Sequence, residues 1–183
     1  MQVLMMCTAN ICRSPMAERF LRRAAEQRGA DVTVASAGLL NGGEPASTGS
    51  TRAMAEHGID LGDHRSRRID TPMIASADLV VAMEVRHVRE AAALVPHRFG
   101  AIYTLRELIK RTQPVGPRHD RPLDEWLTQV GEGRRAADLL RSTDLDIADP
   151  YGGPPEGYIA TAALLAELTE RLADVLWGLP EGH

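Results

Sequence analysis

The sequence predicts a single α/β domain built around a parallel sheet. Short apolar runs alternate along the chain with segments of helical periodicity, and this rhythm is typical of parallel strands joined by helical crossovers. The length of 183 residues matches one domain of ordinary size. With 44% hydrophobic and 25% charged residues, the composition excludes disordered, collagen-like and coiled-coil chains.

Two units of strand and helix are predicted in the first half of the chain. Residues 3–6 form a continuous apolar run, as expected of a strand that is buried on both faces. A helix is expected to begin near Pro15, a favoured first helical residue, and to end at Gly29. Residues 32–37 are rich in β-branched side chains and predict a second strand, and a helix over 51–57 is expected after it.

Two further strands and a long helix are predicted in the second half. Strands are expected over 79–83 and 101–105, with a helix over 84–94 between them. The last helix is predicted over 155–177, where apolar side chains recur at helical spacing. Those side chains are Tyr158, Ala162, Leu165, Leu168, Leu172 and Leu176.

The alternation of strands and helices breaks between residues 111 and 147. Prolines and glycines there indicate loops, but apolar residues with helical spacing predict an inserted helix. These residues are Leu123, Trp126, Leu127 and Val130. We therefore expect a helical insertion over 112–142 within one domain that spans 1–183.

The loop between the first strand and the first helix is the candidate functional site. Residues 7–14 have the sequence CTANICRS and lead into the start of a helix, where unpaired N–H groups and the helix dipole favour an anion. Ligands of parallel α/β sheets bind outside the carboxyl ends of the strands, and this loop follows such an end. The position alone predicts a phosphate site.

Cys7 and Arg13 are the reactive candidates in this loop. A helix start and a neighbouring cation lower the pKa of a thiol, so Cys7 could attack phosphorus as a thiolate. Arg13 supplies a bidentate fork for the oxyanion. The Ser14 hydroxyl could stabilise the thiolate, and Asn10, which tolerates left-handed backbone angles, could hold the loop curved. The alternative reading is a buried thiol in an ordinary turn.

Composition and spacing exclude several other functions. The formal net charge of −4 gives no basic footprint for nucleic acid. The two cysteines, Cys7 and Cys12, are too close in sequence to form a disulfide framework. No pair among the six histidines has the spacing of metal ligands, so we expect no metal and no other cofactor, and we interpret His64 as structural.

The chain is expected to be cytoplasmic and not inserted in a membrane. Residues 1–6 are apolar, but no basic region precedes them as it does in a signal peptide. The most apolar late stretch, 160–179, carries charged residues along its length, so it cannot span a bilayer as a helix.

The sequence CTANICRSPM at residues 7–16 resembles the phosphate-binding loop of the low-molecular-weight protein tyrosine phosphatases. Further segments similar to that family follow in the family's order: SAG at 36–38, GID at 58–60, HRSR at 64–67, VAME at 81–84 and DPYG at 149–152. The resemblance covers nearly the whole chain except the segment after Lys110. It implies a flavodoxin-like fold, a four-stranded parallel sheet flanked by helices.

The resemblance also implies a reaction, the hydrolysis of phosphotyrosine in proteins through a phosphocysteine intermediate. Cys7 would be the nucleophile and Arg13 would bind the phosphate. The rest of the phosphate loop would be Thr8, Ala9, Asn10, Ile11, Cys12 and Ser14. Ala9 stands where many family members have glycine, which affects only the fine geometry of the loop.

A general acid is needed to protonate the leaving oxygen. From the residues alone, Asp144, Asp146 and Asp149 are rivals for this role. The resemblance selects Asp149, first as the acid and then as the base that activates water against the phosphocysteine. It further implies a wall for the substrate ring made by Tyr151, Leu39 and Leu40.

Two loop residues carry further implications of the resemblance. Cys12 is either a small buried hydrophobe or a redox partner that traps an oxidised Cys7 as a reversible disulfide, and the family favours the second reading. Ile11 is typical of the tyrosine phosphatases, whereas the related arginine phosphatases carry threonine at that position. Ile11 therefore favours phosphotyrosine as the substrate.

The expected partner is a tyrosine-phosphorylated protein, with a bacterial tyrosine kinase as one candidate, and the expected state is a monomer. One alternative function is an arsenate reductase that uses an external thiol, because no cysteine lies outside the loop. The other is a non-catalytic phosphate-binding regulator, although Cys7, Arg13 and Asp149 are all present.

The insertion over 112–142 has two readings, because it is longer than the family usually allows. The first is a surface helix pair that packs on the domain. The second is a lid or a partner-docking element, suggested by its position just before Asp149 in the sequence.

Overall fold

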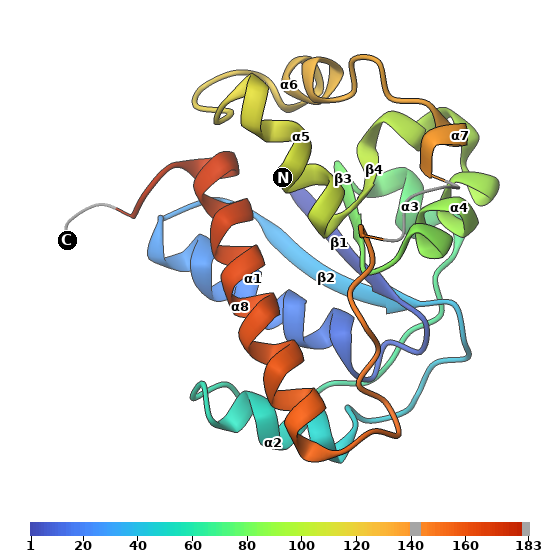
Figure 1. Cartoon of the computed structure of the whole chain (residues 1–183), viewed down its shortest axis with the longest axis vertical. Helices are drawn as coiled ribbons and strands as arrows, with labels where there is room; N and C mark the ends of the chain where they lie inside the picture. Colours follow the sequence, from blue (N-terminus) through green and yellow to red (C-terminus); the bar gives the residue numbers. More distant parts are fainter. Residues whose placement is uncertain (140–143, 181–183) are drawn as a thin grey trace.

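The computed structural model describes residues 1–139 and 144–180 and is organised around a four-stranded sheet (Figure 1). The strands are β1 (Gln2–Cys7), β2 (Thr33–Gly38), β3 (Leu79–Ala82) and β4 (Ile102–Thr104). All neighbours pair in parallel, in the order β2-β1-β3-β4. This order is that of a flavodoxin-like fold, with a switch point between β1 and β3. The predicted fold class is confirmed.

The central strand β1 is buried on both faces. Val3, Met5 and Cys7 belong to one hydrophobic core, and Leu4 and Met6 belong to the other. Successive side chains of a strand point to opposite faces, so a strand between two cores must be apolar at every position. This explains the continuous apolar run that predicted it.

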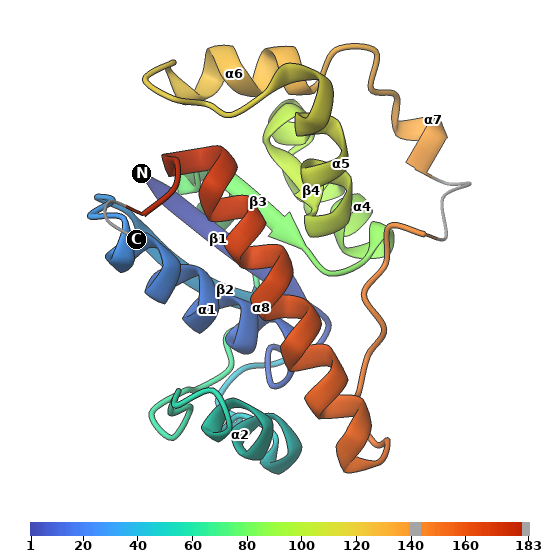
Figure 2. The same cartoon turned by 60° about the vertical axis from the view of Figure 1, so that its left-hand side comes forward.

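Helices cover both faces of the sheet. They are α1 (Arg13–Gln27), α2 (Thr48–Ala55), α3 (Thr71–Ser76), α4 (Val85–Leu94), α5 (Leu105–Val115), α6 (Leu123–Val130), α7 (Ala136–Leu139) and α8 (Pro155–Trp177), with a 3-10 helix η1 (Pro96–Ala101). Figures 1 and 2 show α1 and α8 side by side along one face of the sheet. The helix predicted over 155–177 is confirmed, and all six residues of its predicted face are buried.

Two helices, α3 and α5, were not predicted from the sequence pattern. Helix α3 is only six residues long and depends on its cap, because Asp70 accepts a hydrogen bond from the N–H of Met73 at 2.8 Å. Helix α5 begins where a strand was expected to continue, because the Thr104 hydroxyl accepts from the N–H of Glu107 at 3.0 Å. Residues 112–115 therefore complete α5 and do not belong to the insertion.

The insertion packs on the domain at the amino-terminal end of the strands. Trp126, Leu127 and Val130 of α6 are buried, and α6 contacts α5 and η1 (Figure 2). The loop over 7–14 lies at the opposite, carboxyl end of the strands. The lid hypothesis is therefore wrong for α6, because a position just before Asp149 in sequence does not place it near Asp149 in space. Residues 140–142 of the predicted insertion lie outside the described residues.

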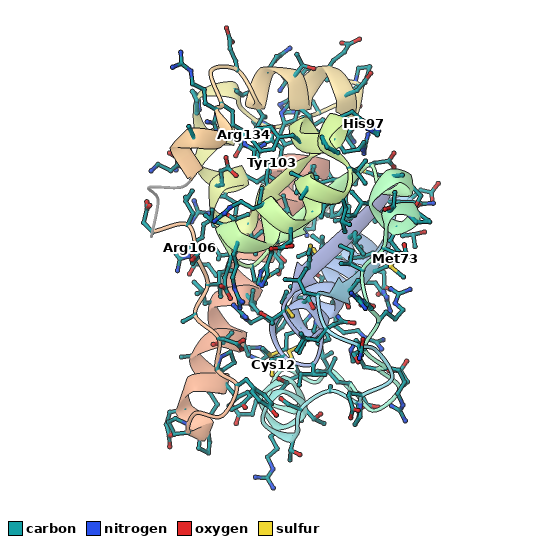
Figure 3. All side chains as sticks on the ribbon, turned by 90° about the vertical axis from the view of Figure 1, so that its right-hand side faces the viewer. Cys12, Met73, His97, Tyr103, Arg106 and Arg134 are labelled. Carbon is teal, nitrogen blue, oxygen red and sulfur yellow. The ribbon has the colours of Figure 1, made fainter. Side chains whose placement is uncertain are left out.

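The buried side chain of Arg134 anchors the segment after α6 to the domain. Arg134 lies between the rings of Phe99 and Tyr103, with its guanidinium carbon 4.0 and 4.1 Å from the two ring centres. Its Nε also donates to a carboxylate oxygen of Glu107 at 2.6 Å. Figure 3 shows Arg134 and Tyr103 together at the end of the molecule away from Cys12. No helix among the described residues has the length and apolarity that a membrane crossing requires.

Candidate active site

Asn10 holds the loop between β1 and α1 in its curved shape. Its backbone has φ of 56°, a left-handed conformation that asparagine tolerates better than most residues. Its side-chain nitrogen donates to the hydroxyls of Ser14 and Ser36 at 2.9 and 2.8 Å. Its side-chain oxygen accepts from the N–H of Arg67 at 2.9 Å. One of these bonds closes the loop onto Ser14 at its own end, and the other two join it to Ser36 and Arg67, so the curvature is fixed.

His64 and Gly38 support the same loop from outside. The Nε2 of His64, which is buried, lies 2.7 Å from the backbone oxygen of Asn10. A Cβ on Gly38 would lie 2.7 Å from both the Asn10 nitrogen and the Thr8 oxygen, so only glycine allows this close approach. His64 has the structural contact that the sequence interpretation gave it.

Two donors surround the sulfur of Cys7, which is 2% exposed. The Ser14 hydroxyl lies 2.9 Å from Sγ, and the N–H of Asn10 donates to Sγ at 3.3 Å. Because the Ser14 oxygen already accepts from the Asn10 side chain, its own proton is free for the sulfur. A thiolate at Cys7 would therefore receive two hydrogen bonds.

Arg13 is fully buried and bridges several elements. Its Nη1 donates to the Glu84 carboxylate and to the backbone oxygen of Ile147, the latter at 2.8 Å. Its Nη2 donates to Asp149 Oδ2 at 2.6 Å and to the Thr8 hydroxyl at 3.4 Å. Its Nε is buried and has no partner among the described residues. One edge of the guanidinium, Nε with Nη2, is therefore open to an anion once Asp149 is displaced.

Backbone donors complete the anion site at the start of α1. Among the described residues, no acceptor is bonded to the backbone N–H groups of Ala9, Ile11, Cys12 and Arg13. Unsatisfied N–H groups at a helix start, together with the helix dipole, favour a bound anion. Within the described part of the chain, no three His, Cys, Asp or Glu residues gather as a metal-ligand set.

The structure separates the three aspartates that competed for the acid role. Asp149 alone among them contacts Arg13. Asp146 accepts from the N–H of Val85 at 2.7 Å and so caps α4, and Asp144 lies 3.6 Å from Lys110 on the surface. The geometry thus places Asp149 at the loop.

The three residues expected to form a substrate wall lie on two loops beside the phosphate loop. The backbone N–H groups of Leu39 and Leu40 both donate to the Thr8 oxygen, at 2.6 and 3.1 Å. Leu40 is 55% and Tyr151 is 65% exposed, whereas Leu39 is half-buried. The N–H of Tyr151 donates to Asp149 Oδ1 at 3.3 Å. The exposed rings and chains are available to a substrate.

The side-chain hydrogen bonds of Cys12 are made with a segment outside the phosphate loop. Its thiol is buried and donates to the Ser47 hydroxyl at 3.2 Å. Burial raises the pKa of the Cys12 thiol, although hydrogen bonding with Ser47 and Ser50 acts to lower it. Both Cys12 and Cys7 are free thiols in this structure.

Sequence analysis gave no role to Glu84, Arg86 and His87, which complete the site. Burial by itself raises the pKa of the Glu84 carboxyl, but hydrogen bonds from Arg86 and Arg13 outweigh it and hold the pKa at about 2. Burial lowers the pKa of His87 to about 4. Their one signal in the sequence was their position after the β3 run, since the carboxyl end of β3 lies beside that of β1.

Comparison with known proteins gives a consistent set of matches. Residues 2–116 match the family model described as "Low molecular weight phosphotyrosine protein phosphatase". The chain is 30% identical to the protein-arginine-phosphatase of Bacillus subtilis, over 96% of this chain and 97% of that protein. The crystal structure of a low molecular weight protein tyrosine phosphatase from T. tengcongensis is similar, with 31% identity, a TM-score of 0.73 and coverage of 96% and 99%.

A further solved structure is similar over nearly the whole chain. It is a cysteine-to-serine mutant of the YwlE arginine phosphatase with a phosphorylated active-site serine. Its identity to this chain is 29% and its TM-score is 0.71, with 95% of this chain and 94% of that chain covered.

Proposed function

Because the chain belongs to the low molecular weight phosphotyrosine protein phosphatase family, and is therefore a phosphatase, we propose that it hydrolyses phosphotyrosine in proteins through a phosphocysteine intermediate. The observation that carries the proposal is the set of open donors around the Cys7 sulfur. The buried Nε of Arg13 and the free N–H groups of the loop have no protein partner among the described residues. A phosphate group satisfies all of them at once.

The first step transfers phosphorus to sulfur. The phosphate replaces Asp149 on Nη2 of Arg13 and also takes Nε, which holds phosphorus next to Cys7 Sγ. A sulfur–phosphorus bond forms as the bond from phosphorus to the tyrosyl oxygen breaks. Asp149, released from Arg13, takes up a proton from solvent and gives it to that leaving oxygen. Positioned acids of this kind contribute about 10²- to 10⁴-fold.

The second step restores the enzyme. The Asp149 carboxylate takes a proton from a water molecule, and the water oxygen bonds to phosphorus as the sulfur–phosphorus bond breaks. Phosphate leaves and Cys7 becomes a thiolate again, stabilised by the Ser14 hydroxyl and the N–H of Asn10. The phosphorylated serine in the YwlE mutant supports a covalent step at the corresponding position of a relative.

Two substrates are compatible with the family, because one relative is a protein-arginine-phosphatase. Ile11 favours tyrosine, since an apolar side chain on the loop offers no hydrogen bond to a guanidinium group. The exposed Tyr151 and Leu40 also suit the two faces of an aromatic ring. Phosphoarginine is the second candidate.

The remaining features of the proposal concern regulation and partners. When Cys7 is oxidised to a sulfenic acid, the Cys12 thiol would displace water and form a disulfide that reductants reverse. The substrate would be a tyrosine-phosphorylated protein, for example a bacterial tyrosine kinase. The phosphatase itself would act as a monomer in the cytoplasm.

The proposal is tested by phosphate release from a phosphotyrosine peptide in excess chelator, with a phosphoarginine peptide as comparator. We expect the wild type to cleave phosphotyrosine without metal and Cys7→Ser to be inactive. Preference for phosphoarginine would select the second candidate. Failure on both substrates, with arsenate reduced when thiols are added, would replace the phosphatase reaction with arsenate reduction.

A further inference from the structure

A buried histidine beside the phosphate loop has no role in the chemistry above. His87 lies in the first turn of α4 and is fully buried. Its Nε2 is 3.0 Å from the Thr8 hydroxyl oxygen, and its Nδ1 has no partner among the described residues. A buried polar atom without a partner costs stability. The contact between Nε2 and Thr8 is therefore expected to have a function that offsets this cost.

The hydrogen-bond count at Thr8 fixes the protonation of this ring. A hydroxyl has one proton and two lone pairs. The Thr8 oxygen lies 2.6 Å from Nη2 of Arg86 and 3.4 Å from Nη2 of Arg13, and guanidinium groups only donate. The 2.6 Å contact takes one lone pair and the weaker 3.4 Å contact faces the other, which leaves the Thr8 proton for Nε2 of His87. In this arrangement Nε2 is unprotonated and the neutral ring carries its proton on Nδ1.

The charges that face His87 agree with a neutral ring. Glu84 Oε1, 3.9 Å from Nε2, favours the charged form, whereas the guanidiniums of Arg13 and Arg86 disfavour it. Burial is the largest influence and lowers the pKa of the ring to about 4. The acceptor at Nε2 is therefore present throughout the neutral pH range.

We propose that His87 is a positioning residue that orients the Thr8 hydroxyl so that it holds two guanidiniums, the buried Arg13 and the exposed Arg86, beside the phosphate loop. Arg86 is 52% exposed, and its other contact is Glu84, within two residues of it. Thr8 is thus what directs this second cation toward an incoming phosphate. The inference rests on the proposed function for its relevance to catalysis, but it concerns anion binding and can be tested without a substrate.

The test compares three variants. His87→Phe fills the space but accepts no proton from Thr8. His87→Gln offers a side-chain oxygen at a similar reach and restores the acceptor. Val88→Ala, at a fully buried position on the same helix, destabilises the fold without touching the loop. The measurements are the dissociation constant of inorganic phosphate by calorimetry and the ¹⁵N spectrum of the His87 ring.

We expect phosphate to bind about five- to ten-fold more weakly to His87→Phe, because the bond lost between the Thr8 hydroxyl and the neutral ring is an ordinary one between uncharged groups. His87→Gln should recover most of that loss, and Val88→Ala should show none. The spectrum should show Nε2 unprotonated and Nδ1 protonated at pH 7. A proton on Nε2, or equal phosphate affinity in His87→Phe and the wild type, would overturn the inference. Failure of the proposed function would show itself separately, as absent turnover by a wild type that still binds phosphate.

Discussion

The ion pair between Arg13 and Asp149 predicts that removing the acid makes the phosphate site bind its ligand more tightly. Asp149 Oδ2 is 2.6 Å from Nη2 of Arg13, on the edge of the guanidinium that a phosphate would take. Phosphate must therefore break this pair before it binds. Asp149→Asn weakens the interaction with Arg13 that competes with phosphate, and Asp149→Ala removes this interaction.

The size of the effect follows from the exposure of the two partners. A hydrogen bond to a charged group contributes about 1.5–3 kcal/mol, and exposed ion pairs contribute less than about 1 kcal/mol. The Arg13 side chain is 1% exposed but that of Asp149 is 38% exposed, so the pair lies between these limits. A value of about 1–2 kcal/mol corresponds to phosphate binding that is roughly 5- to 30-fold tighter in Asp149→Ala, and by less in Asp149→Asn.

The assay is calorimetric titration with inorganic phosphate, because turnover by these variants is expected to fall about 10²- to 10⁴-fold. Asp146→Asn is the matched control, since it removes the same charge from the same segment without touching Arg13. Phosphate affinity within two-fold of the wild type in Asp149→Ala would refute the reasoning. So would an equal gain in Asp146→Asn, because the effect would then be a general one of net charge.

Three further results are expected. After peroxide treatment, reductant should restore the wild type but not Cys12→Ser, and full recovery of that variant would exclude a protective disulfide. The folded state lowers the pKa of His87 from 6.5 to about 4, so the unfolded chain binds more protons and the free energy of unfolding should fall by about 3 kcal/mol as the pH drops from 6.5 to 4. Urea titrations between pH 6.5 and 4 should show that the free energy of unfolding falls less with pH in His87→Gln than in the wild type. An equal fall in both proteins would mean that other groups cause it. Gly38→Ala should push the phosphate loop outward, since the added Cβ lies 2.7 Å from backbone atoms of Asn10 and Thr8, and phosphate affinity as in the wild type would show that the loop can adapt.

The parts of this molecule that sequence analysis predicted are those specified by local patterns. The two-sided burial of β1 follows from its continuous apolar run, and the six-residue face of α8 follows from helical periodicity. Cys7 and Arg13 could be proposed together from the sequence because both residues lie on one short loop. Helix α3 was missed because six residues carry too little periodicity to be recognised, and its local signals were the cap Asp70 and Pro72 in its first turn.

The parts that were missed depend on which strands are neighbours. Glu84 and His87 reach the loop because β3 lies next to β1, an arrangement that periodicity does not encode. For the insertion, closeness in sequence was wrongly taken to indicate closeness in space. Proximity in sequence to Asp149 suggested a lid, but α6 is fixed at the other end of the sheet, where Trp126 is buried and Arg134 is stacked between two rings.

The two carboxylates on Arg13 have different exposures, and this difference explains how the site can be both rigid and open. Glu84 is 15% exposed and binds Nη1, where the Ile147 oxygen also accepts, so that end of the guanidinium is anchored in the fold. Asp149 is more exposed and binds Nη2, beside the unpartnered Nε. A lysine could satisfy only one of these ends, because its ammonium is a single point charge. In the proposed mechanism, the planar fork of arginine would let one edge stay bound to Glu84 while the other exchanges Asp149 for the phosphate, so that substrate binding itself would release Asp149 to act on the leaving group.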